Sequence, residues 1–154
     1  WIVDELESSM LLYFTGASRS SAAIIDEQKK NTETGKTDAV EAMHKIKQSA
    51  VDMKLALLKG DVRTFADIIR EGWENKKKMA NQITNPMIQE AMDVAMSAGA
   101  LAGKVSGAGG GGFIMFVLEP TKKKLVENAL KSFVMPFQFT DGGAHGWKIF
   151  DTGL

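Results

Sequence analysis

The chain has 154 residues, of which 44% are hydrophobic and 25% charged, values that are ordinary for one globular domain with a hydrophobic core. Its 19 lysines and arginines equal its 19 aspartates and glutamates in number, which argues against nucleic acid or an anionic membrane as the main partner. Because the sequence contains no cysteine, disulfides, thiolate metal sites and thiol catalysis are excluded, and a cytoplasmic location is expected. No apolar stretch approaches the roughly 20 residues of a membrane span.

Apolar periodicity along the chain predicts alternating strands and helices. Short apolar runs that end at turn residues indicate buried strands, and apolar residues that recur every three or four positions indicate amphipathic helices. The predicted elements, in chain order, are a strand over 9–14, helices over 22–31, 38–59, 62–73 and 86–98, strands over 101–106 and 113–118, a helix over 120–133, and a final pair of strands around Phe137 and Phe139 and around Trp147 and Ile149.

Polar residues at the expected starts of three helices predict caps. Asp38 and Glu41 have the spacing of a capping box. Asp61 precedes the next helix, and Asn85 is followed by Pro86, a residue favoured at the first helical position. The two aspartates are therefore interpreted as caps and not as catalytic acids.

Without its additional helices this element order is βαββαβ, the ferredoxin-like plan. The expected fold class is therefore α+β: a ferredoxin-like antiparallel sheet with additional helices, which we expect on one face of the sheet. Residues 1–154 are expected to form a single domain. The chain begins at Trp1 and soon reaches a strand, which favours an origin within a longer protein.

The segment Lys104–Gly112 carries the clearest functional signal, because its four consecutive glycines are costly to order. Glycines that adopt positive φ let successive N–H groups converge on an anion such as a phosphate. A Walker A loop and a dinucleotide-binding loop both continue into a helix, whereas here Phe113 begins a strand. Both of those loops are excluded, and a flexible hairpin connection without a ligand remains the alternative.

The same residues, with the sequence KVSGAGGGGF, resemble the third conserved motif of the GHMP kinases, Lys-x-Ser/Thr-Gly-Ala-Gly-x-Gly-Gly, and match each fixed position. Residues 13–21 are similar to the start of the C-terminal domain of sugar kinases in this family. Within the family, the resemblance is strongest to the kinases that act on D-glycero-D-manno-heptose 7-phosphate. It extends over essentially the whole chain.

The resemblance implies a two-domain kinase with its active site between the domains, of which this chain is the C-terminal domain. ATP and Mg²⁺ are the implied cofactors, and a sugar phosphate, ATP and the protein's own N-terminal domain are the implied partners. The family's ATP phosphate loop, its aspartate base and its magnesium-binding acid belong to that N-terminal domain. We therefore expect neither a catalytic residue nor a metal ligand among residues 1–154, and we expect this chain alone to be inactive.

Two groups of site residues follow from the motif and the resemblance. The expected cofactor-binding residues are Lys104, Ser106, Gly107, Ala108, Gly109, Gly110 and Gly111. The expected substrate-binding residues are Thr15, Gly16 and Arg19, since a strand gives way there to a helix N-terminus and the planar fork of arginine suits a phosphate. The alternatives are a solvated lysine at position 104 and a surface ion pair at Arg19.

The remaining charged and metal-binding side chains favour no further site. His44 and His145 have no second histidine or cysteine in register, so neither predicts a metal centre. The short runs Lys76–Lys78 and Lys122–Lys124 are interpreted as solvated helix faces. A free-standing ferredoxin-like module that binds a small metabolite remains the alternative function, because the fold alone does not decide between the two.

Overall fold

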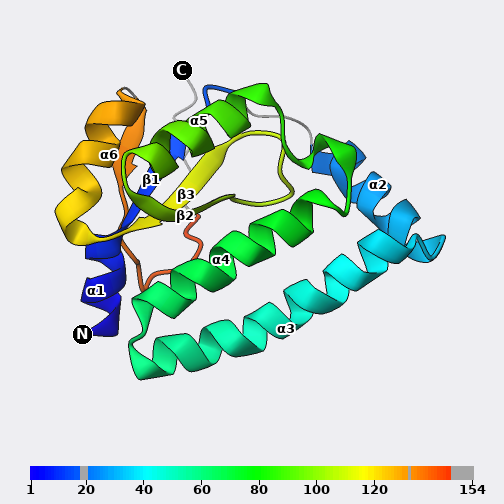
Figure 1. The fold of residues 1–154 in the computed structure, drawn as a ribbon, viewed down its shortest axis with the longest axis horizontal. Helices are drawn as coiled ribbons and strands as arrows, with labels where there is room; N and C mark the ends of the chain where they lie inside the picture. Colours follow the sequence, from blue (N-terminus) through cyan, green and yellow to red (C-terminus); the bar gives the residue numbers. More distant parts are fainter. Residues whose placement is uncertain (18–20, 132, 147–154) are drawn as a thin grey trace, which may run out of the picture.

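The computed structural model describes residues 1–17, 21–131 and 133–146 (Figure 1). The α-helices are α1 (Ile2–Ser9), α2 (Ser21–Glu33), α3 (Thr37–Lys59), α4 (Val62–Lys77), α5 (Pro86–Ser97) and α6 (Lys123–Leu130). The strands are β1 (Met10–Phe14), β2 (Ala100–Val105), β3 (Phe113–Leu118) and β4 (Val134–Pro136), and two short 3₁₀ turns are η1 (Asn81–Ile83) and η2 (Pro120–Lys122). No helix in these ranges is long and apolar enough to cross a membrane.

The four strands form one antiparallel sheet in the order β2-β3-β1-β4. This is the order of a ferredoxin-like fold, so the predicted α+β class is confirmed. The register pairs Phe14 with Phe113 and Val105 with Ile114. The end of β1, the end of β2 and the start of β3 therefore meet at one end of the sheet.

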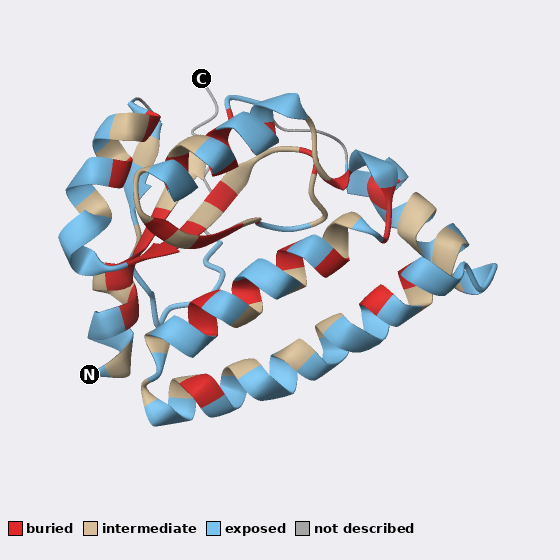
Figure 2. Ribbon diagram, in the orientation of Figure 1, coloured by how far each residue is buried: buried red, intermediate tan, exposed pale blue. Residues whose placement is uncertain are grey.

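Helices cover both faces of this sheet, and the expectation that they lie on one face is wrong. Leu11 and Phe116 belong to a buried cluster with α5 and α6, whereas Met10 and Val117, one position along, belong to a second cluster with α1, α3 and α4. Figure 1 shows α4 and α3 across the sheet from α5, and Figure 2 shows the buried residues of α4 along its sheet-facing side. The unbroken apolar run of β3 agrees with this arrangement, because a strand covered on both faces needs no polar side.

Two of the three predicted caps are confirmed. The Thr64 N–H donates to the Asp61 side chain and the Ile88 N–H donates to the Asn85 side chain, at the starts of α4 and α5. The capping box at Asp38 is wrong, because α3 begins one residue earlier and Asp38 lies in its first turn.

The C-terminal part differs from its prediction. Helix α6 ends at Leu130, short of Phe133, whose φ of 73° is incompatible with a right-handed helix. Beyond β4, residues 137–146 form no strand, although Phe137 packs against the cluster of α1, α3 and α4. The predicted strand around Trp147 and Ile149 lies outside the described residues.

Candidate functional site

The glycine loop, residues 106–112, connects β2 to β3 at the end of the sheet where β1 also ends (Figure 1). A bond from the Ser106 N–H to the Phe113 carbonyl, 2.8 Å long, closes its base. Segments from three other parts of the chain brace it: the residues after β1, the turn before α5, and the last turn of α4.

The first brace is the segment after β1. The Thr15 N–H donates to the Gly112 carbonyl at 2.9 Å, and the Gly112 N–H donates to the Ala17 carbonyl at 2.8 Å. The Thr15 hydroxyl lies 3.0 Å from the Gly112 oxygen and 3.1 Å from the Ala17 oxygen. With Thr15 only 5% exposed, its side chain holds the loop, while the adjacent Gly16 is exposed. Arg19 lies outside the described residues, so its substrate-binding role stays a prediction.

The second brace is the turn between η1 and α5. The Gly110 N–H donates to the Ile83 carbonyl at 2.8 Å, and the Asn85 amide nitrogen donates to the Gly110 carbonyl at 3.1 Å. Asn85 also caps α5 through its side-chain oxygen. The sequence predicts this cap but not the contact with the loop, since no spacing pattern relates residues 85 and 110.

The third brace is Lys76 in the last turn of α4, whose ammonium donates to the Gly107 carbonyl. Interpreting all of Lys76–Lys78 as a solvated face is wrong for Lys76 and Lys77, which are both partly buried, whereas Lys78 is exposed. Burial, and then the neighbouring ammonium of Lys104, hold the pKa of Lys76 below its usual value. Both lysines line a cavity of about 240 Å³ whose other walls come from α3 and α4: Ile46, Ser49, Ala50, Met53, Ile68, Ile69, Gly72 and Trp73.

The bracing leaves part of the loop's hydrogen-bonding capacity unused. The amides of Gly110 and Gly112 are bonded to protein carbonyls, as described above. Those of Gly107, Ala108, Gly109 and Gly111 donate to no acceptor in the part of the chain that the structure describes. Unbonded amides on a glycine loop can hold phosphate oxygens, so the arrangement can bind an anion.

The described residues contain no cluster of side chains that could hold a metal ion on its own. Within residues 1–17, 21–131 and 133–146, no group of three or more histidine, aspartate and glutamate side chains lies close enough to hold a metal ion. We therefore assign no step to a metal bound by these residues.

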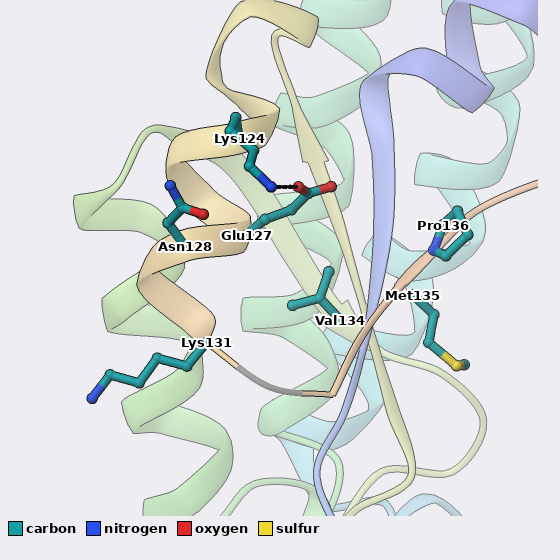
Figure 3. Close-up of a pocket in the computed structure, with 7 residues that line it drawn as sticks. All are labelled: Lys124, Glu127, Asn128, Lys131, Val134, Met135 and Pro136. Atoms are coloured by element: carbon teal, nitrogen blue, oxygen red, sulfur yellow. Dashed lines mark hydrogen bonds and ion pairs between the residues drawn. The ribbon is translucent and has the colours of Figure 1, made fainter.

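A second hollow, of about 550 Å³, lies between α6 and β4. Its walls are Lys124, Glu127, Asn128, Lys131, Val134, Met135 and Pro136. Figure 3 shows the ion pair of Lys124 with Glu127, 3.4 Å long, and Lys131 pointing away from it. None of the predicted site residues lines this hollow, so the glycine loop remains the candidate site.

Comparison with known proteins identifies the family. The family model described as "GHMP kinases C terminal" matches residues 53–134, more than half of the chain. The chain belongs to the GHMP kinases. The matched segment includes the glycine loop together with Lys76 and Asn85, and the family resemblance of the glycine motif is confirmed.

Relatives of this GHMP kinase domain are named as sugar kinases. The D-glycero-alpha-D-manno-heptose 7-phosphate kinase of Campylobacter jejuni is 40% identical over 97% of this chain and 44% of its own length. A crystal structure of a D-glycero-D-manno-heptose 1-phosphate kinase from Bacteroides thetaiotaomicron is 57% identical, with a TM-score of 0.63, over 97% of this chain and 39% of that one. The chain thus spans less than half the length of either protein.

A more distant relative supports the fold. A crystal structure of Leishmania major mevalonate kinase with R-mevalonate superposes with a TM-score of 0.75 over 82% of this chain and 40% of that one. Its sequence identity is 16%, so this similarity is evidence for the shared fold alone.

Proposed function

We propose that this chain is the C-terminal domain of an ATP-dependent sugar-phosphate kinase that phosphorylates D-glycero-D-manno-heptose 7-phosphate. The observation that carries the proposal is the braced glycine loop with its unbonded amides, in a chain of the GHMP kinase family. The choice of sugar is supported by the relative of that name, which is 40% identical over 97% of this chain.

The role of this chain would be to bind and orient phosphate groups. Transfer of a phosphoryl group depends mainly on positioning the reactants and on stabilising negative charge spread over several oxygens. Amides held in place by three neighbouring segments suit that task, because they need no rearrangement when the ligand binds. ATP and Mg²⁺ would be held mainly by an N-terminal domain, and the chain described here would form one wall of the cleft.

The test is a kinase assay on the protein that contains this chain together with that N-terminal domain. We expect ATP-dependent phosphorylation of the heptose 7-phosphate, with ³¹P NMR of the product identifying the new phosphate ester. Unphosphorylated heptose, galactose and mevalonate are the control substrates. Preferred turnover of a control substrate would overturn the heptose proposal, and binding of the sugar phosphate without turnover would favour a metabolite-binding module.

A further inference from the structure

The contact between Lys76 and the glycine loop differs from the ion pairs made by its neighbours on α4. The Lys77 ammonium pairs with Glu74 at 2.7 Å. Within the described ranges, no carboxylate lies at ion-pair distance from Lys76. The acceptor that its ammonium meets there is the Gly107 carbonyl, a charge-assisted hydrogen bond and so stronger than one between neutral groups.

Within the described ranges, the Gly107 carbonyl accepts no hydrogen bond besides the one from Lys76. The φ of Gly107 is +77°, and a methyl group placed on its Cα would meet no atom within 4 Å. Gly109, by contrast, is confined, because a methyl group on its Cα would lie 2.8 Å from the Ile83 carbonyl oxygen. Among the described residues, Lys76 is therefore the group that holds the Gly107 carbonyl by a hydrogen bond.

The orientation of the Gly107 carbonyl also sets the direction of the Ala108 N–H. None of the described peptide bonds is cis, and in a trans peptide the C=O and the following N–H point in opposite directions. A Gly107 carbonyl held toward α4 thus turns the Ala108 N–H away from α4. This N–H is one of the loop amides without an acceptor in the described residues.

We propose that Lys76 is a positioning residue: by holding the Gly107 carbonyl, it aims the Ala108 N–H at a phosphate oxygen of the bound ligand. The proposal rests on the kinase function proposed above, in which both ATP and the sugar substrate carry phosphate oxygens. Burial and the nearby charge of Lys104 oppose the charged form of Lys76, so the ammonium occupies this position at a cost that a solvated lysine would avoid.

Kinetics of the complete two-domain protein test the proposal. With Lys76→Met we expect the KM for one of the two phosphate-bearing substrates to rise about ten-fold, the usual effect of losing one hydrogen bond to a charged group. Which KM rises identifies the ligand that the Ala108 amide meets. Lys76→Arg should recover most of the loss, and Lys77→Met, the same change one residue along, should leave both KM values unaltered.

Unchanged KM values for both substrates in Lys76→Met would overturn the proposal, and so would a fall in kcat alone. If Lys76→Met fails to fold, Lys76→Gln replaces it under the same criteria. If the unmodified protein phosphorylates no sugar phosphate, the proposed function fails. NMR of the 154-residue chain then tests separately whether Lys76 sets the orientation of the Gly107–Ala108 peptide. The Ala108 amide resonance should then move more than that of Gly111 on Lys76→Met, and an unmoved Ala108 resonance would overturn the inference.

Discussion

At the scale of single residues, the glycines of the loop are needed for different reasons. Gly107 and Gly109 both have positive φ, 77° and 112°, where an L side chain is strained. They differ in the space for a side chain: a Cβ added at Gly109 would come within 2.8 Å of the Ile83 carbonyl oxygen, whereas one added at Gly107 would have open space. The Ile83 carbonyl also accepts a hydrogen bond from the Gly110 N–H, so it cannot move aside without breaking the second brace.

Replacing each of these glycines by alanine should separate the two effects. We expect Gly107→Ala to lower the free energy of unfolding by about 1 kcal/mol, through backbone strain. Gly109→Ala should lower it by about 2–4 kcal/mol, because overpacking adds to the strain. Urea denaturation of the 154-residue chain measures both. Equal losses would contradict the view that Ile83 confines the loop.

The sequence predicted the loop but not the groups that hold it. The Lys104–Phe113 motif predicted a loop between two strands, because four consecutive glycines are costly to order and suit a backbone that comes close to another group. The sequence does not indicate a role for Lys76, because it belongs to a run of three lysines that is typical of a solvated face. Its contact with Gly107 joins residues 31 positions apart, and such a contact depends on how α4 lies across the sheet, which local periodicity does not encode.

At the scale of elements, the start of α5 is both a helix end and a support for the loop. The Asn85 oxygen accepts from the Ile88 N–H at 3.0 Å, and its nitrogen donates to the Gly110 carbonyl at 3.1 Å. A single side chain thus connects the stability of α5 with the position of the loop.

Two substitutions at this residue should separate the cap from the brace. Asn85→Asp keeps a good cap and loses the donor, so we expect a loss of about 1 kcal/mol in the free energy of unfolding. Asn85→Ala loses both and should cost about 2–3 kcal/mol. Hydrogen exchange at Gly110 should accelerate in both variants, whereas exchange in the first turn of α5 should accelerate in Asn85→Ala alone. Accelerated exchange there in Asn85→Asp would contradict this division.

The sequence predicts those elements well whose apolar pattern is clear, and it predicts poorly those whose conformation depends on tertiary contacts. The helices α3, α4 and α5 and the strands β1, β2 and β3 lie within a few residues of their predicted ranges. Helix α1 was missed because its eight residues include only three apolar ones. The segment after β4 alternates like a strand, yet the Phe139 N–H donates to the Glu7 carboxylate at 2.7 Å, a contact that the sequence pattern does not indicate.

At the scale of the whole molecule, the braced loop is the part of the chain that we propose as one side of a site. Three segments brace it, through Thr15, Asn85 and Lys76, and four of its amides have no acceptor in the described residues. The chain spans 44% of its Campylobacter relative. The family resemblance implies that the ATP phosphate loop, the aspartate base and the magnesium-binding acid belong to an N-terminal domain, so the two walls of the proposed cleft would have separate tasks.

This division predicts that residues 1–154 fold but do not catalyse. The chain has buried clusters on both faces of its sheet, so we expect a cooperative thermal transition followed by circular dichroism. Its rate of ATP-dependent phosphorylation of the heptose 7-phosphate should fall below that of the two-domain protein by about 1,000-fold or more, because positioning and charge stabilisation by the other domain are lost. The two-domain protein, assayed in parallel, is the positive control. Substantial turnover by a folded, purified 154-residue chain would show that the catalytic groups lie within it, and would contradict the assignment of catalysis to the other domain.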